Sequence, residues 1–264
     1  MATEPFEISL LGGATEARYR RLRPAGEDAL PWHLLTEAEL SDTERDAARR
    51  GWTAAALQEY ASAAAQAAIL RALVRAQVPL DLSGMASGFA VDELAHAELC
   101  ARIAQGLGGG ATISASESHF PVVVQSPEPL LDAARAVLWS CCICESWSKR
   151  VLRENAARTT HPLAQAVWSR IAKDETLHGE FGWIFLGWLS DALEPTERAA
   201  LRATTAQSVA FFRKGFGTMA KTAGINAASL GVLPGFSEAE YAVFAEDVLE
   251  REVISRLREF GLAG

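Results

Sequence analysis

Apolar positions along most of this chain recur every three or four residues, the spacing that places them on one face of an α-helix. An Ala-rich run of this kind begins after Ser41, which could form a capping box with Glu44, and it stops before Pro79. Three further helical runs lie at about residues 89–107, 127–159 and 162–189. The pattern therefore predicts an all-α protein with four long helices in this part of the chain.

The links between these helices differ in length. Short breaks rich in glycine or proline join helix one to helix two, and helix three to helix four. A long stretch of small, polar and β-branched residues, 108–129, separates helix two from helix three. Because short links join antiparallel neighbours and a long link can cross a bundle, this order predicts a four-helix bundle with a long crossover between helices two and three.

Two segments flank the predicted bundle of residues 41–190. Residues 1–40 show little helical periodicity, so we expect an irregular N-terminal extension there. Within residues 191–264, Thr196 and Ser237 have the character of N-caps of two more helices, separated by a glycine-rich segment. These additional C-terminal helices are expected to pack on the bundle, and they could supply an oligomer surface compatible with a homodimer.

The composition narrows the expected compartment and partners. Charged residues make up 22% of the 264 positions and the formal net charge is -8, with no long basic cluster. We therefore expect no nucleic-acid partner. The apolar runs are too short to cross a bilayer and the start of the chain lacks a basic segment before an apolar one, so a cytoplasmic protein without membrane contact is expected.

One short string, Asp-Glu-x-x-His, occurs twice inside otherwise apolar helical stretches. The copies are Asp92, Glu93 and His96, then Asp174, Glu175 and His178. Residues three apart share a helix face, so each copy directs one carboxylate and one imidazole the same way. Random placement would yield far fewer than one such string, and an ionised group on an apolar face is costly to bury.

Helices one and three each carry a glutamate near mid-length on the face expected to be buried, Glu59 and Glu145. A single glutamate in a helix is usually solvated, and a single histidine on an apolar face is more often a core residue than a ligand. Four buried carboxylates together, however, require a counter-charge, which two divalent cations would supply. Mixed carboxylate and imidazole ligation suits iron or manganese better than structural zinc.

The aspartates of the two strings are placed to support the histidines. Asp92 and Asp174 lie about 100° of helix rotation from the adjacent glutamates, off the direct ligand direction. A carboxylate there can reach the free ring N–H of the histidine on a facing helix and fix its orientation. The alternative is that both are surface acids that make local pairs.

This set resembles the ligands of the ferritin-like di-iron carboxylate superfamily, which includes rubrerythrins and many di-iron oxygenases. The resemblance covers about residues 41–190 and implies a ferritin-like bundle that binds two iron ions; a manganese–iron pair would use the same residues. The implied metal ligands are Glu59, Glu93, His96, Glu145, Glu175 and His178. By the same resemblance Glu93 and Glu175 would bridge the metals, and the oxidising chemistry would occur near Glu59 and Glu145.

Several superfamily members place a threonine one turn after the third-helix glutamate, and Ser148 could serve there more weakly. The resemblance implies a di-iron oxygenase or oxidase that activates O₂ or a peroxide to oxidise a small organic substrate, with an external electron donor. A ferroxidase or iron-handling protein is one alternative, and a tRNA-modifying hydroxylase is another. The small residues Ala55, Ala56 and Ala63 could leave room for a substrate or only permit close helix packing.

Overall fold

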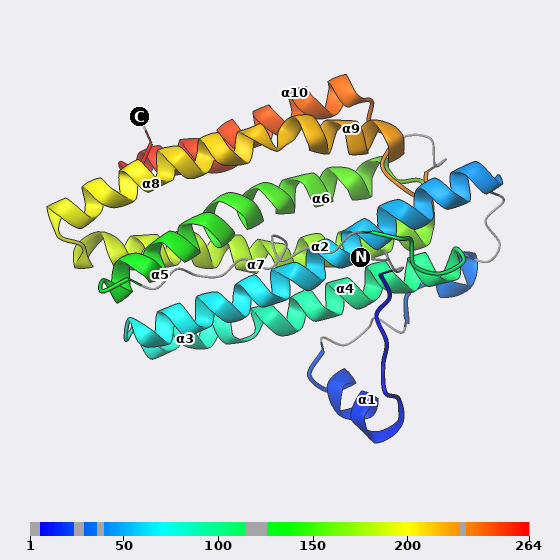
Figure 1. Cartoon of the computed structure of the whole chain (residues 1–264), viewed down its shortest axis with the longest axis horizontal. Coiled ribbons are helices and arrows are strands. Elements are labelled where there is room, and N and C mark those ends of the chain that lie inside the picture. The colour runs from blue at the N-terminus through cyan, green and yellow to red at the C-terminus, as the bar shows by residue number, and fades with distance from the viewer. Residues whose placement is uncertain (1–5, 24–28, 36–39, 114–125, 227–230, 264) are drawn as a thin grey trace.

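The computed structural model of the chain describes residues 6–23, 29–35, 40–113, 126–226 and 231–263, with the backbone alone for 223–226. Within these ranges the regular elements are helices; the long ones lie side by side along one axis, and the short α1 lies apart from them (Figure 1). The prediction of an all-α protein is therefore confirmed for the described part of the chain. None of its helices is both long enough and apolar enough to cross a bilayer.

Helix α2 (Asp42–Arg75) pairs with helix α4 (Phe89–Gly106). The predicted capping box at the start of α2 is present, because the Ser41 hydroxyl accepts a hydrogen bond from the Glu44 amide and the Glu44 carboxylate accepts one from the Ser41 amide. The two helices run antiparallel: Arg49, near the start of α2, donates to the Gly110 carbonyl, which lies just beyond the end of α4.

A second antiparallel pair follows. The predicted third helix consists of α5 (Pro129–Val137), the π-helical segment η4 (Leu138–Glu145) and α6 (Ser146–Arg158). Helix α7 (Pro162–Ala192) packs along η4 and α6. The π-helical turns were not predicted from the sequence. Directly after them, the hydroxyl of Ser146, the first residue of α6, donates to the carbonyl of Cys141, five residues earlier, and accepts a hydrogen bond from the indole N–H of Trp183 on α7.

Close packing between α7 and η4 depends on Gly182. A Cβ atom at this position would lie 2.9 Å from the backbone nitrogen of Cys142 and 2.9 Å from the Cβ of Cys141. Such distances are shorter than packed carbon atoms tolerate, so any larger residue would push the two helices apart. The absence of a side chain at this turn of α7 therefore sets how near Glu145 comes to the residues of α7.

The remaining helices include several that the sequence did not predict. Helix α1 (Gly13–Arg20) and the 3₁₀ turn η2 (Trp32–Leu35) lie in the segment expected to be irregular, and α3 (Leu80–Ser87) falls in an expected connection. Helix α8 (Pro195–Lys214) is capped by Glu194 rather than by Thr196, because a proline occupies its first turn. Helix α9 (Phe216–Asn226) occupies part of the predicted glycine-rich break.

The last helices lie against the two pairs, on the upper side in Figure 1. Ser237 caps α10 (Glu238–Val248) as predicted, and the π-helical η5 (Leu249–Ile254) and α11 (Ser255–Glu259) continue it. Helix α8 contacts α5 and η4, α9 contacts α2, and α10 and η5 contact α6. Two of the C-terminal elements, α8 and η5, therefore contact η4 directly.

Two apolar clusters lie at different levels of the helices, with the charged strings between them. Along α7, Val167 and Ile171 belong to one cluster, while Phe181 and Phe185 belong to the other. The first cluster includes Trp52 of α2 stacked on Trp168, with ring centroids 4.4 Å apart. Because apolar packing continues on both sides, the polar residues between the clusters are held in fixed positions and shielded from water.

Candidate metal centre

The structure brings the six predicted ligand residues together at mid-length of the helices. Glu59 comes from α2, Glu145 is the last residue of η4, and α4 and α7 each supply the glutamate and histidine of one string. They form two overlapping groups in which the ligand atoms all lie within 4.8 Å of one another. The first, called here the His96 half, contains Glu59, Glu93, His96 and Glu175; the second, the His178 half, contains Glu93, Glu145, Glu175 and His178.

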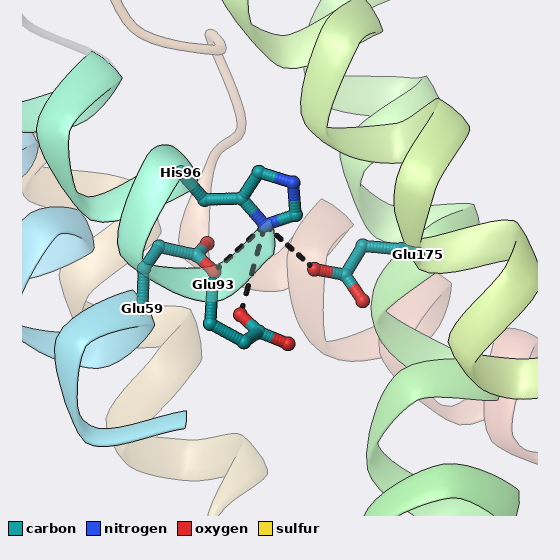
Figure 2. Close-up of side chains that lie close together, drawn as sticks. All are labelled: Glu59, Glu93, His96 and Glu175. Atoms are coloured by element: carbon teal, nitrogen blue, oxygen red, sulfur yellow. Dashed lines mark ion pairs between the residues drawn. The ribbon is translucent and has the colours of Figure 1, made fainter. Parts of the chain in front are cut away.

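In the His96 half three carboxylates converge on one ring nitrogen, as Figure 2 shows. The Nδ1 atom of His96 lies 3.3 Å from Glu175 Oε1, 3.6 Å from Glu93 Oε2 and 3.7 Å from Glu59 Oε2. Glu93 and His96 are almost completely buried, whereas the Glu59 side chain retains 12% of its exposure. This half can therefore present three carboxylates and one imidazole to a single ion.

The His178 half uses the other oxygens of the same two shared glutamates. The Nδ1 atom of His178 lies 3.0 Å from Glu175 Oε2 and 3.2 Å from Glu93 Oε1. Glu93 and Glu175 thus each turn one oxygen toward His96 and the other toward His178. A carboxylate disposed in this way can bridge two cations, one in each half, and Glu145 completes the second group.

The outer nitrogen of each histidine meets the aspartate of the facing string. The Nε2 atom of His96 lies 3.1 Å from Asp174 Oδ2, and that of His178 lies 3.4 Å from Asp92 Oδ2. The contact expected from helix geometry is therefore present in both halves. With Nε2 protonated and donating to the aspartate, the Nδ1 lone pair is directed into the cluster. Arg170, one turn before Asp174, forms a salt bridge with that carboxylate.

Two of the glutamates have pKa values shifted toward their protonated forms when only protein groups balance their charge. Burial raises the pKa of Glu59 to about 8, with the carboxylates of Glu93 and Glu175 adding to the shift. Burial likewise raises the pKa of Glu145 well above its usual range, again with contributions from Glu175 and Glu93. With all four carboxylates ionised, the cluster would therefore carry more negative charge than the surrounding protein can compensate.

The histidines and Glu175 shift in the direction that favours their charged forms. Burial alone would lower the pKa of His178, but contacts with Asp92, Glu175 and Glu93 raise it well above its usual value. Burial would raise the pKa of Glu175, yet its contacts with the two histidines hold it well below the usual range. Protonated imidazoles thus occupy the place where a cation would sit, and a cation would displace the protons on Nδ1.

Several buried atoms at the centre lack a hydrogen-bond partner. Both carboxylate oxygens of Glu93 and the Nδ1 atom of His96 make no hydrogen bond within the described structure, although all are shielded from water. Such groups are costly unless they bind a cation, and carboxylate oxygen and imidazole nitrogen are good ligands for iron and manganese. The donor set, its overlap at two shared carboxylates and its orphaned atoms therefore fit a pair of divalent ions.

One partner of the cluster was not predicted from the sequence. Gln66, which is 1% exposed, donates a hydrogen bond from Nε2 to Glu145 Oε1 at 2.9 Å. It lies two helical turns after Glu59 on the same face of α2, and that spacing could have identified it. Ser148 is half-buried on α6 and makes no hydrogen bond with the other predicted site residues in the described ranges. Its predicted part in catalysis stays a prediction.

A cavity of about 480 Å³ reaches Glu145 from the side of the C-terminal helices. Its α2 wall carries small residues, but these are Ala61, Ser62 and Ala65 rather than the predicted Ala55, Ala56 and Ala63. Ala56 and Ala63 are buried in helix packing instead.

Comparisons of the chain with family models, curated proteins and solved structures found no match.

Proposed function

We propose that the protein is a non-haem di-iron oxidoreductase, an oxygenase or oxidase that uses O₂ or a peroxide to oxidise a small organic substrate. The observation that carries the proposal is that Glu93 and Glu175 each direct one oxygen to His96 and the other to His178. A pair of bridging carboxylates has no use around a single ion. In this proposal α2, α4, the α5–η4–α6 helix and α7 form a ferritin-like four-helix bundle. The predicted crossover at 108–129 stays a prediction, because residues 114–125 lie outside the described part of the chain.

The protein groups would hold the ions and set the protonation of the site. Glu59 and Glu145 would each serve as the terminal carboxylate of one half, and the two aspartates would orient the imidazoles through Nε2. Two iron ions bound there would supply the electrons that reduce O₂ or peroxide. The four glutamates balance two divalent charges, and an external donor would restore the reduced state. A manganese–iron pair fits the same ligands.

The cavity favours oxidation of an organic molecule over iron handling. Glu145, a proposed ligand, forms part of the cavity wall, and the surrounding side chains include Trp139, Phe211 and Phe212. Apolar walls of this kind exclude water from a reacting centre and attract an organic substrate. A site that only oxidises iron needs a polar entry route for cations instead.

Anaerobic titration with Fe²⁺ tests the proposal directly. We expect two iron ions per chain by elemental analysis, and rapid O₂ consumption when the loaded, reduced protein meets air. Glu180→Gln, an exposed change on the same helix as Glu175, is the matched control and should leave both values unaltered. Failure of the intact helical protein to retain iron would refute the proposal.

The iron titration, light scattering and a tRNA-binding assay together separate the alternatives. A ferroxidase would oxidise many Fe²⁺ ions per chain and form a large hollow oligomer detectable by light scattering. A tRNA-modifying hydroxylase would bind tRNA at low salt, which the net charge of -8 disfavours. The di-iron oxygenase or oxidase is expected to show neither behaviour and to stop at two irons per chain.

A further inference from the structure

The cavity beside Glu145 has a distinct charge arrangement. It lies between α2, η4 and the junction of α8 with α9, and its volume of about 480 Å³ is in the range of small-molecule sites. Among the residues that line it, Glu145 is the only acid and Lys214 the only base. Glu145 is 7% exposed, whereas Lys214 is exposed at the surface. The cavity therefore has an acidic inner wall next to the proposed metals and a basic outer rim.

The region between these two charges is mainly apolar and uncrowded. Trp139, Phe211, Phe212 and Met219 contribute large side chains to one side. Small residues of α2, including Ala61 and Ala65, form the facing side and leave the space open. Three polar side chains, Gln58, Ser62 and Ser140, also line the cavity, but most of the wall is apolar, so an aliphatic chain or an aromatic ring would gain burial there.

Lys214 has no partner for its charge among the described residues, unlike its neighbour. Arg213 pairs with Glu246 at 2.7 Å, but Lys214 lies within ion-pair distance of no carboxylate in the described ranges. An unpaired ammonium at the rim of an apolar cavity can bind an anionic group that stays partly in water. The same group would lose its hydration without gaining a cationic partner if it moved inward, because no second base lines the cavity.

We propose that this cavity is the substrate site of the di-iron centre and takes an amphipathic organic monoanion. Its anionic head would contact Lys214 and its apolar body would extend toward Glu145, so that the end remote from the charge lies next to the metals. The head can be a carboxylate or a phosphate monoanion, which share this chemistry. The inference rests on the proposed function for the identity of the reaction, but the binding itself requires no iron.

Binding of matched probes tests the charge requirement. Octanoate, octyl phosphate, 1-octanol and octylammonium share one chain and differ in the head group, and calorimetry with the purified protein gives each affinity. We expect at least one anion to bind more tightly than the alcohol, and the ammonium to bind weakest. Lys214→Met should weaken the anion roughly three- to fivefold and leave 1-octanol unchanged, whereas Lys221→Met, on the exposed side of α9, should alter neither.

A second pair of variants tests the location. Ala65→Phe fills the cavity from α2 and should weaken octanoate and 1-octanol at least about tenfold. Ala64→Phe, its exposed neighbour, should have no effect. Both variants should keep the helical circular dichroism and the iron content of the parent, which excludes misfolding as the cause.

The outcomes separate this inference from the proposed function. Binding of an anion that depends on Lys214 and Ala65, in a protein that takes up no iron, would keep the site and remove the di-iron proposal. Iron uptake and O₂ consumption without binding of either anion at millimolar concentration would overturn the substrate site alone. Equal affinity for octanoate and octylammonium would also overturn it, because Lys214 would then have no part in recognition.

Discussion

The two halves of the proposed metal centre have the same ligand types but different surroundings. Each contains one histidine and one terminal glutamate, and both use Glu93 and Glu175. In the His96 half the aspartate on the outer nitrogen is itself held by Arg170. In the His178 half the corresponding Asp92 is 24% exposed at its side chain and lies farther from the ring, at 3.4 Å.

The terminal glutamates also have different surroundings. Glu59 lies in no cavity wall described above, whereas Glu145 borders the apolar cavity and accepts a hydrogen bond from Gln66. The repeated sequence pattern therefore gives both halves the same ligand types, while the neighbouring helices give them different surroundings. We infer that the His96 ring is the more firmly oriented of the two histidines and that the His178 half is where a substrate approaches.

The largest expected effect comes from removing a carboxylate that both halves share. Glu175→Ala takes away one oxygen from each half, so we expect elemental analysis to find neither metal bound. Glu59→Ala and Glu145→Ala each remove a ligand from one half only and should leave about one metal per chain. Glu180→Ala on the exposed side of α7 serves as the control and should keep two. Retention of one metal in Glu175→Ala would show that the carboxylate does not bridge.

The next effect is a pH dependence of opposite sign with and without metal. The folded-state pKa of Glu59 is about 8, and those of Glu145 and both histidines are also raised. A raised pKa gives stability that is complete below the unfolded value and is lost as pH rises. The metal-free protein should therefore lose stability from about pH 4.5, the unfolded pKa of Glu59, up to pH 8, and the histidines add to the loss above their unfolded pKa of 6.5. The slope is about 1.4 kcal/mol per pH unit for each retained proton.

Metal reverses the trend because its ligands must lose these protons. With Mn²⁺ in excess, the added stability should grow over the same window, and urea denaturation at several pH values measures both curves. The lowered pKa of Glu175 contributes stability that is already complete above its unfolded value, so it does not alter this window. Glu59→Gln, which is permanently neutral, should reduce the slope of the metal-free curve. A metal-free stability that rises with pH would contradict the charge arrangement.

A smaller effect should distinguish the two aspartates. Asp174→Asn removes a carboxylate that lies 3.1 Å from His96 and also contacts Arg170, so metal affinity in the His96 half should fall roughly 10- to 100-fold. Asp92→Asn, at the longer and more exposed contact, should weaken the His178 half by roughly tenfold or less. Competition with a chelator measures both affinities. Equal losses would show that exposure and Arg170 do not make the halves unequal.

The sequence predicted the clustered residues because their pattern is local. Three-residue spacing puts Glu93 with His96, and Glu175 with His178, on single helix faces, and charge on apolar faces marked the positions. The long helices and the Ser41 capping box followed from equally local signals. These features depend on residues within one or two turns, which a sequence displays directly.

Features that depend on contacts between distant segments were not predictable in this way. The π-helical turns of η4 are stabilised against α7, where Gly182 admits the wider backbone. The cavity exists because α8 and α9 lie over α2 and η4, and no periodicity shows where those helices dock. Helix α3 was missed because Gly84 and Gly88 indicated a break, whereas packing of Leu82 and Ala86 favours a helix there.

The smallest expected effect concerns Gln66 and sharpens the comparison most finely. Its amide donates to Glu145 Oε1 at 2.9 Å, and its own Oε1 is buried without a hydrogen-bond partner. Gln66→Leu keeps the volume and loses the donor, which costs about 0.5–1.5 kcal/mol and corresponds to roughly two- to tenfold weaker binding in the His178 half. The His96 half should be unaffected, since no contact joins it to Gln66 in the described structure.

Stepwise Mn²⁺ titration resolves the two affinities, and Gln58→Leu on the same helix is the control because Gln58 is exposed and makes no hydrogen bond to the cluster. A loss in both halves would mean that Glu145 is coupled to the shared carboxylates strongly enough for the two sites to act as one. A loss confined to one of the two binding steps would show that the asymmetry observed around Glu145 extends to metal affinity. Gln66 would then be a positioning residue for the half that faces the cavity.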